Sequence, residues 1–599
     1  AGKITSIDAS AFSGCTGFTS FTIPETVKTL GASAFANCTG LTEVTIPETV
    51  TALPASVFSG CTGLTSVTLP ETVTSIADKA FSGAGLKEIV IPDSVKTIGK
   101  NVFEKNVSLT AVTFPADMTT VMDYMFSGCT ALETITLPEK ITAINAYAFQ
   151  GCISLKNISM PGVTNIGGSA FVDCSALENL ELPSGLTTIQ SSAFKNCTSI
   201  KKLTIPGMLS TIKSSAFQDC TGLEEVEAAE GITTIGELAF YNCSGLKKII
   251  LPSTFTTLNP RAFYKCSGLT EAELKGDQLV LADQGIYSAD KKTLVMWLPG
   301  AEGTAKVADG TETIGTNAFN YCEKITEITL PDGLQTISAS AFDYCTALGS
   351  IALPETVTSI EKQAFRSTAL KEITIPSGVK TLPSNLFASC LKLERVVLPE
   401  GLEKLETGAF LACKSLKSVT LPSTVTSIGT QAFMTCESLK DIEIPEKITA
   451  IPSNLFKGCL SLETVTLPEG LTSIASAAFQ SCTNLSFVYY RGTEAQMAAV
   501  KVTATNNAPY LDAVYICSYQ GLDESLEAAV IKTQPVPASY QQNEEAKALS
   551  LEITPTGEEG EQYYFNWFCN SENSTSGGTK MTAESDSVSS KTTPLTDTL

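Results

Sequence analysis

The chain has 599 residues, of which 62 are acidic and 40 basic, so its formal net charge is −22 at pH 7. A surface this negative repels nucleic acid, heparin-like chains and anionic lipid, which leaves cationic or neutral partners. Histidine is absent, which excludes Ser-His-Asp and Cys-His catalysis, histidine metal sites and the usual general base near neutral pH. No apolar run reaches 18 residues, so we expect neither a membrane span nor a signal peptide in this stretch.

A phenylalanine recurs every 22 or 23 residues, with one gap of 56 residues between Phe263 and Phe319. The recurring residues are Phe12, Phe35, Phe58, Phe81, Phe103, Phe126, Phe149, Phe171, Phe194, Phe217, Phe240, Phe263, Phe319, Phe342, Phe365, Phe387, Phe410, Phe433, Phe456 and Phe479. Periods of this size are typical of stacked repeats, in which each repeat buries its apolar residues against its neighbours. The sequence therefore predicts a solenoid of twenty rungs over residues 1–484.

One repeat shows the expected local structure. Residues 41–46 are rich in β-branched residues and alternate as a strand with one buried face, and Pro47 ends that strand because proline cannot donate to a sheet. A second short extended piece follows at residues 50–53, then about one helical turn that carries Phe58, and Gly63 is expected to supply a left-handed turn position. The predicted fold class is an α/β repeat solenoid, strand-rich, with short helical turns and a parallel sheet.

Cysteine has a fixed place in the repeat. Seventeen of the 19 cysteines stand three residues after a repeat phenylalanine, and Ala84, Asn106 and Thr368 replace cysteine in three rungs. This substitution pattern favours a slot for a small, partly apolar side chain, and so predicts reduced, buried thiols. Disulfides between adjacent rungs and metal binding are the alternatives, which the required torsion and the linear spread of the thiols disfavour.

The repeat pattern L-x-x-V-x-I-P-x-x-V-x-x-I-x-x-x-A-F-x-x-C resembles the BspA-type leucine-rich repeats of bacterial cell-surface proteins. The resemblance covers about residues 1–518, with departures such as Ala229 and Ala308 at the proline position. It implies an extracellular or cell-surface protein, and some members of the family are described as adhesins for host matrix proteins, host cells or other bacteria. It brings no binding residues, because the motif that defines the family is its core.

The gap in the period holds an insertion at about residues 264–318. Its apolar runs at 279–287 and 293–298, joined by the polar residues 288–292, predict a hairpin. Six aromatic residues lie in or beside it and form the candidate partner-binding patch: Tyr241, Tyr264, Tyr287, Trp297, Tyr321 and Tyr344. Tyrosine and tryptophan are enriched at interface hot spots, so the patch is a candidate protein or glycan contact. The alternative is that Trp297 and its neighbours only seal the insertion.

The expected strand face is nearly uniform. Threonine recurs between its two inward positions at Thr45, Thr68, Thr113, Thr136, Thr204, Thr329, Thr420 and Thr466, and glutamate interrupts it at Glu181, Glu227, Glu273 and Glu443. Strand propensity and solubility explain a threonine ladder, and an extended surface for many weak contacts is the alternative.

The ends of the chain depart from the repeat. Residues 485–518 are expected to cap the solenoid, with a short helix that Thr493 caps and a closing strand. Residues 519–530 are an expected linker, and residues 531–599 resemble a truncated bacterial Ig-like sandwich with Trp567 at its core. The chain starts in mid-rung without an initiator methionine, so we expect it to be a fragment of a longer protein.

Together these features favour a non-catalytic protein. We predict adhesion to a protein or glycan on host matrix or cells, and a passive structural or spacer role in the envelope is the alternative. We expect no cofactor, no metal and no catalytic residue, because the repeats imply no pocket with convergent carboxylates.

Overall fold

A computed structural model of the chain describes residues 4–519, 530–531, 553–554, 566–569 and 579–582. The chain divides into two compact units, residues 1–401 and residues 402–599. Each unit is described by itself.

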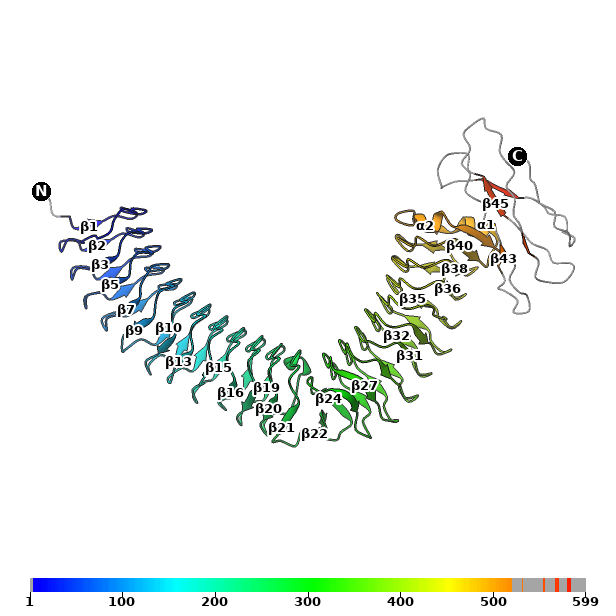
Figure 1. Ribbon diagram of the computed structural model, residues 1–599, viewed down its shortest axis with the longest axis horizontal. Coiled ribbons are helices and arrows are strands. Elements are labelled where there is room, and N and C mark those ends of the chain that lie inside the picture. The colour runs from blue at the N-terminus through cyan, green and yellow to red at the C-terminus, as the bar shows by residue number, and fades with distance from the viewer. Residues whose placement is uncertain (1–3, 520–529, 532–552, 555–565, 570–578, 583–599) are drawn as a thin grey trace, which may run out of the picture. The chain divides into compact units, whose positions relative to one another are not determined.

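In the first unit, most rungs contribute one short strand to each of two parallel sheets, and both sheets are interrupted along the unit (Figure 1). β3 (Glu43–Thr45) pairs with β5 (Ser66–Thr68) of the next rung, and β4 (Ala52–Leu53) pairs with β6 (Ser75–Ile76). Because a parallel pair needs a long connection, the chain travels once around the rung between paired strands. The third side of each rung consists of turns that carry the phenylalanine and cysteine.

The sheet that contains β3 is called the first sheet, and its other strands in this unit are β7 (Glu88–Val90), β9 (Ala111–Thr113), β11 (Thr134–Thr136), β13 (Asn157–Ser159), β16 (Lys202–Ile205), β18 (Glu225–Ala228), β20 (Lys248–Leu251), β21 (Glu271–Leu274), β25 (Gly303–Lys306), β27 (Ile325–Thr329), β29 (Ser350–Ile351), β31 (Glu372–Thr374) and β33 (Arg395–Val397). The second sheet, with β4 and β6, also has β1 (Ser6–Ile7), β2 (Thr29–Leu30), β8 (Thr97–Ile98), β10 (Thr120–Val121), β12 (Ala143–Ile144), β14 (Asn165–Ile166), β15 (Thr188–Ile189), β17 (Thr211–Ile212), β19 (Thr234–Ile235), β26 (Thr313–Ile314), β28 (Thr336–Ile337), β30 (Ser359–Ile360) and β32 (Thr381–Leu382).

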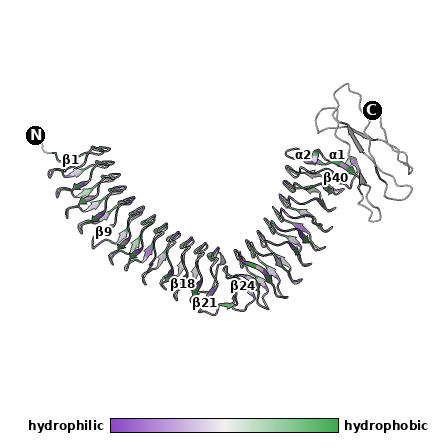
Figure 2. Ribbon diagram, in the orientation of Figure 1, coloured by the Kyte–Doolittle hydropathy of each residue, from purple (hydrophilic) through white to green (hydrophobic). Residues whose placement is uncertain are grey.

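The strands follow the alternation in the sequence. In β3, Val44 is buried between the exposed Glu43 and Thr45, and β3 ends before Pro47. Apolar and polar residues therefore alternate within each rung, as Figure 2 shows. Because the rungs repeat the same pattern of buried and exposed residues, the buried side chains form columns that run along the unit.

The expected helical turns are wrong for most rungs. Residues 54–61 form three overlapping β-turns, in which Cys61 N–H donates to the Phe58 carbonyl and Ser56 and Gly60 adopt left-handed backbone angles (φ 57° and 75°). The reason is inter-rung bonding: the N–H groups of Ser56, Phe58 and Gly60 donate to carbonyls of the next rung at 2.8–3.0 Å. A helix would turn these donors along its own axis. Among the described residues of this unit, only η1 (Pro260–Phe263) is helical.

The expected role of Gly63 is also wrong. Gly63 has no left-handed backbone angle; instead, a Cβ there would lie 2.4 Å from the carbonyl oxygen of Thr39 in the preceding rung. Glycine is needed at this position because two backbones approach closely.

The phenylalanines form one stacked column in the interior. From Phe35 to Phe263, consecutive rings are 5.0–5.9 Å apart between centroids and nearly parallel, and each is fully buried. Ring stacking at this spacing contributes beyond burial alone.

The cysteines beside this column are free thiols that also donate hydrogen bonds. The Cys61 Sγ donates to the carbonyl oxygen of Phe35 in the preceding rung at 3.0 Å, and most rung cysteines repeat this bond. Asn106 does the same through Nδ2 to Phe81 at 2.7 Å. Most side chains in this slot are therefore hydrogen-bond donors as well as small, and Ala84 is an exception.

The insertion begins with a three-stranded antiparallel meander of β22 (Leu279–Ala282), β23 (Gly285–Ser288) and β24 (Thr293–Trp297). β24 then pairs parallel with β26, so the meander extends the second sheet. Trp297 stacks on Phe319 with ring centroids 5.2 Å apart. Its backbone N–H donates to the carbonyl oxygen of Ala318, as the backbone N–H of a rung phenylalanine does in a regular rung. Residues 297–318 are thus a rung of their own, in which tryptophan replaces phenylalanine.

In the second unit, β36 (Asp441–Glu443), β38 (Thr464–Leu467), β40 (Phe487–Tyr490) and β42 (Val514–Cys517) form one parallel sheet. The other strands of the solenoid in this unit do not belong to that sheet; they are β34 (Lys404–Leu405), β35 (Ser427–Ile428), β37 (Ala450–Ile451), β39 (Ser473–Ile474) and β41 (Lys501–Val502). The short helices are α1 (Glu494–Ala499) and α2 (Ala508–Leu511).

The last rung of this unit is closed by another aromatic ring. Thr493 caps α1 with a capping box to Gln496, as predicted. Tyr510 stacks on Phe479 at 5.0 Å, and Asn507 Oδ1 accepts the Phe479 N–H, which the next rung would otherwise bind. The side chain of Asn507 thus ends the backbone ladder.

Beyond residue 519 the described residues form two antiparallel pairs, β43 (Val530–Ile531) with β44 (Ile553–Thr554) and β45 (Asn566–Cys569) with β46 (Thr579–Thr582). The rest of the expected linker and Ig-like sandwich lies outside the described residues, so the sandwich remains a prediction. No helix of the described residues is long and apolar enough to cross a membrane.

Candidate binding surface

The six aromatic residues of the predicted patch fall into two groups. Tyr287 and Trp297 lie in the interior, with 0% and 3% of their surface exposed. The Tyr287 hydroxyl accepts the Ala308 N–H at 3.0 Å, and its ring packs on Gly285. These two side chains therefore pack inside the insertion and seal it, which is the alternative to a role in partner binding.

The other four tyrosines lie on the turn side of the first unit, where Tyr264 is buried and Tyr241, Tyr321 and Tyr344 are half-buried. Tyr264 and Tyr321 come from the rungs before and after the Trp297 rung, yet their ring centroids are only 5.3 Å apart.

The shape of the Trp297 rung explains this contact. Four residues separate the strand residue Leu53 from Phe58, whereas two separate Leu294 from Trp297, and residues 297–301 are all buried. The shortened rung is recessed on the turn side, so the side chains of its neighbours meet above it. Reasoning from the sequence missed this rung, although the 22-residue spacing from Trp297 to Phe319 could have revealed it.

Five side chains stack in order along this part of the unit, and we call them the tyrosine–cation ladder: Tyr241, Lys265, Tyr321, Tyr344 and Arg366. Lys265 Nζ lies 5.7 Å from the Tyr241 ring centre and 5.3 Å from that of Tyr321. Tyr321 and Tyr344 stack face to face at 4.7 Å, and the Arg366 guanidinium lies 5.1 Å from the Tyr344 ring centre. Cation–π contacts of this geometry are favourable, and more so when desolvated.

The ladder occupies an unfavourable backbone position. Tyr321 and Tyr344 adopt left-handed angles (φ 60° and 59°), two residues after their phenylalanines. Other rungs mostly place glycine, asparagine or aspartate there, as at Gly14, Asn37, Gly60, Gly83, Gly128, Gly151, Asp173, Asn196, Asp219 and Asn242. Those residues tolerate left-handed angles far better than tyrosine does, so the two tyrosines are kept despite a backbone cost.

A buried ion pair supports the end of the ladder. Arg366 makes two hydrogen bonds to the Asp343 carboxylate, Nε to Oδ1 at 2.8 Å and Nη2 to Oδ2 at 2.5 Å. Burial raises the pKa of Asp343, and the bond from Arg366 offsets part of that rise. The buried Asn320 side chain also bonds this carboxylate, while its Oδ1 has no partner. The network holds Arg366 against Tyr344.

At the other end, Arg261 lies 5.5 Å from the Tyr264 ring centre and pairs with Glu237 at 2.7 Å. Burial raises the pKa of Tyr264.

A second tyrosine pair was not anticipated. Tyr124 and Tyr147, each two residues before its phenylalanine, stack at 4.7 Å with rings 7° from parallel. Their 23-residue spacing in the sequence was the available signal.

The exposed face of the first sheet carries charges that are paired between rungs. Lys202 pairs with Glu225 at 2.8 Å, Lys247 with Glu224 at 2.7 Å, and Lys248 with Glu273 at 3.4 Å. Pairs this exposed contribute little stability.

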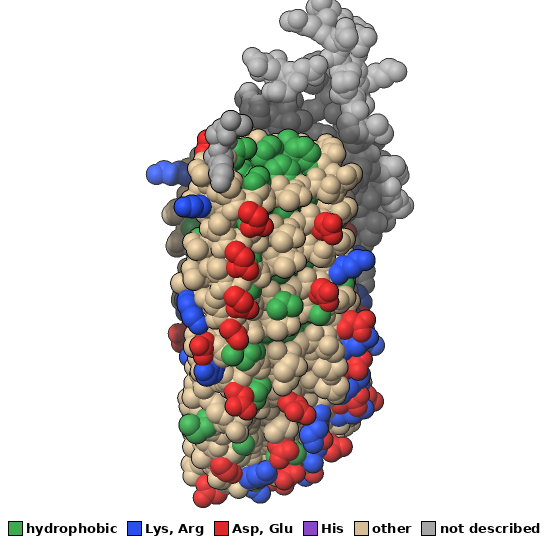
Figure 3. All heavy atoms as spheres, turned by 90° about the vertical axis from the view of Figure 1, so that its left-hand side faces the viewer, with side chains coloured by type: hydrophobic (Ala, Val, Ile, Leu, Met, Phe, Trp, Pro, Cys, Tyr) green, Lys and Arg blue, Asp and Glu red, His purple; other side chains and the backbone are tan. Residues whose placement is uncertain are grey.

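Acidic side chains are frequent on the face of the molecule shown in Figure 3. Glu25, Glu48, Glu71 and Asp93 stand exposed just after the prolines of four successive rungs. Such a column contributes to the negative field of the protein.

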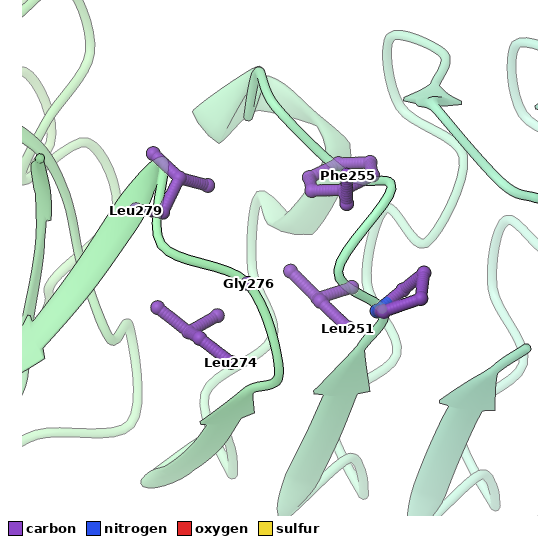
Figure 4. A pocket seen from close by; sticks show the side chains of 6 residues that line it. Leu251, Phe255, Leu274, Gly276 and Leu279 are labelled. Atoms are coloured by element: carbon purple, nitrogen blue, oxygen red, sulfur yellow. The ribbon is translucent and has the colours of Figure 1, made fainter. Parts of the chain in front are cut away.

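The cavity shown in Figure 4 is small and apolar. Leu251, Phe255, Leu274 and Leu279 line it together with Pro252 and Gly276, and it measures about 10 Å³. This is room for one water at most. No group of described residues has the ligands for a metal ion.

Two parallel sheets, a turn side and one buried ring per rung define a parallel β-solenoid of the leucine-rich-repeat type. The family model described as "BspA type Leucine rich repeat region" matches residues 1–110, 96–223, 191–288, 312–436 and 404–516. The chain belongs to this family.

Several solved structures similar to this chain come from bacteria. A leucine-rich repeat protein from Bacteroides ovatus is 23% identical, with 86% of this chain and 87% of that chain covered and a TM-score of 0.35. A leucine rich cell surface protein from Faecalibacterium prausnitzii is 24% identical, with 72% and 86% covered and a TM-score of 0.33. The pneumococcal vaccine antigen PcpA is 18% identical, with 86% and 84% covered and a TM-score of 0.26. No curated protein matches the chain.

Proposed function

We propose that this chain is a non-catalytic, cell-surface or secreted protein that binds a protein or glycan ligand on host or neighbouring cells through the exposed faces of its solenoid. Membership of the BspA-type family supports the location and the binding role, since the family resemblance points to surface proteins and adhesins. The observation that carries the proposal is the tyrosine–cation ladder.

Three properties of the ladder favour recognition. Tyrosines are frequent at binding hot spots, these ones are half-buried rather than hidden, and two of them stack with the cations Lys265 and Arg366. Because other repeats fold with different residues at the same position, such as Gly151, Asn242 and Ser367, folding alone does not require tyrosine there.

The test is a binding screen of the full chain against immobilised matrix proteins, mucin and epithelial cells. The double variant Tyr321→Phe/Tyr344→Phe keeps both rings stacked and removes only the hydroxyls, which typically contribute about 1 kcal/mol each. We expect it to lose about 30-fold in affinity with an unchanged melting temperature.

The matched control is Tyr124→Phe/Tyr147→Phe, which removes two hydroxyls from the equivalent stack outside the ladder. It should bind as the unaltered chain does. Absence of saturable binding by the unaltered chain would instead favour the alternative, a passive spacer in the envelope.

A further inference from the structure

The geometry points to a ligand class for the ladder: we propose that Lys265 binds the carboxylate of an acidic sugar, whose hydroxyls bond those of Tyr321 and Tyr344. This inference rests on the proposed binding function and deepens it. Three features of the ladder carry it, namely an unpaired cation, free hydroxyls and covered ring faces.

Lys265 is the ladder's unpaired cation. Arg366 is bound by Asp343, and the nearby Arg261 by Glu237. The Lys265 ammonium has no ion-pair partner among the residues that the structure describes; Glu323 acts on it only from a distance. Lys265 Nζ lies between the rings of Tyr241 and Tyr321, and a hydrogen bond with Tyr241 raises the pKa of Lys265. An incoming carboxylate would therefore find a positioned, uncompensated charge.

The tyrosines of the ladder can offer a ligand their hydroxyl groups, because the faces of their rings are already covered. Lys265 covers one face of Tyr321, Tyr344 covers the other, and Arg366 covers the far face of Tyr344. The hydroxyls of Tyr321 and Tyr344 make no hydrogen bond to the described residues and are not buried. The ladder therefore presents a row of hydroxyl donors and acceptors.

These features together fit a sugar better than a peptide. A peptide hot spot needs an apolar surface for its anchor side chain, and the stacked ring faces are no longer available for that purpose. A sugar acid supplies one carboxylate for Lys265 and several hydroxyls for the tyrosines. The net charge of −22 disfavours a long polyanion, so the ligand is a glycan with isolated or terminal acids.

The experiment uses the full chain and biotinylated polyacrylamide probes in biolayer interferometry. One probe carries sialyllactose, one carries a glucuronic acid disaccharide, one carries lactose as the neutral match, and one carries a glutamate-rich peptide. The first two distinguish sialic acid from uronic acid as the source of the carboxylate. We expect at least tenfold tighter binding of one or both sugar acids than of lactose or the peptide.

The decisive variant is Lys265→Met, which keeps the aliphatic stem between the rings and removes the charge. We expect it to lose the tenfold preference, because a charged hydrogen bond is among the stronger polar contacts. Lys265→Arg should keep most of the preference, and Lys213→Met, at an exposed lysine with no ion pair among the described residues, should change nothing.

Equal binding of lactose and the sugar acids would overturn the proposal, as would an unchanged preference in Lys265→Met or tighter binding of the acidic peptide. Adhesion of the unaltered chain to cells or mucin that Lys265→Met does not affect would remove this subsite and leave the adhesive function standing. Failure of the unaltered chain to bind cells, matrix and every probe would remove both.

Discussion

At the residue scale, side-chain donors tie each rung to the one before it. The Phe35 carbonyl accepts the Cys38 N–H of its own rung and the Cys61 thiol of the next. Threonine repeats this device on a strand side, where Thr65 Oγ1 donates to the Thr42 carbonyl at 3.2 Å. A side chain that both fills a slot and donates explains why the repeat conserves its spacing from rung to rung.

Asn106 tests this donor role. Asn106→Ala removes the bond to Phe81 and leaves a small void, and it should lower the free energy of unfolding by about 1–2 kcal/mol. Asn106→Cys should be neutral or stabilising, because it restores a donor and removes the buried Oδ1 that has no partner. Urea unfolding followed by circular dichroism measures both variants.

Ala84 supplies the reciprocal control, because it occupies the same slot without a donor. Ala84→Cys should add a bond to the Phe58 carbonyl and raise the free energy of unfolding by about 1 kcal/mol. If Asn106→Ala and Asn106→Cys proved equally stable, the slot would select for size alone.

At the element scale, the rung is the unit of structure, and the Trp297 rung is its main irregularity in the first unit. It takes its place in the ring column through Trp297, although it is shorter and no ring contact joins it to Phe263 among those that the structure records. The meander β22–β24 fills the space that a regular rung would occupy. One tryptophan thus restarts the stacking after the insertion.

Trp297→Phe should cost little, because it keeps an aromatic ring on Phe319 and removes the Nε1 donor that has no partner. Trp297→Ala should destabilise residues 297–318 by about 3–5 kcal/mol, since it opens a large cavity in the ring column. Hydrogen exchange measured by mass spectrometry would locate the loss.

Phe194→Ala is the control in a regular rung, where both neighbouring rings remain to stack. Faster exchange in residues 297–318 only for Trp297→Ala is the expected pattern. Equal exchange in Trp297→Ala and the unaltered chain would show that the meander, rather than the tryptophan, holds this rung.

At the scale of the whole molecule, the same buried thiol recurs in most rungs, so small effects on its pKa add up. Seventeen thiols share the same slot, and those with a resolved shift have a pKa above the ordinary value because burial disfavours the thiolate. Burial raises the pKa of Cys61 to about 12 and that of Cys390 to about 11. The thiols are therefore neutral, and protected from reaction, while the protein is folded.

This predicts instability in alkali. Below the pKa of an unfolded cysteine, about 8.5, both states keep their thiol protons and stability does not depend on them. Above it the unfolded chain loses protons that the folded chain retains, so the free energy of unfolding should fall progressively from about pH 9 toward pH 12. Denaturation midpoints in urea at pH 7, 8, 9 and 10 measure the slope.

Thiol labelling gives the independent check. In the native protein at pH 8, a disulfide reagent should react first with the half-buried Cys15 and Cys517, and the buried thiols should react only on unfolding. Rapid labelling of all cysteines in the native state, or midpoints unchanged up to pH 10, would contradict this account.

The sequence by itself determined the solenoid, the inward direction of Phe58 and Cys61, the strand ends before the prolines and the cap at Thr493. The first three features recur in each rung with the period of the sequence, and the cap depends only on residues next to one another in the chain. A period defined by phenylalanine also led us to miss the Trp297 rung, which carries tryptophan at that position.

Only the tertiary structure decided that β-turns replace the helical turns, that Tyr287 and Trp297 face inward, and that Tyr264 meets Tyr321. The turns form because backbone donors bond the adjacent rung, and no single repeat contains that partner. The tyrosines meet because the intervening rung is recessed, a consequence of packing between residues 57 positions apart in the chain. Contacts of this kind depend on how rungs stack, which a one-dimensional pattern does not contain.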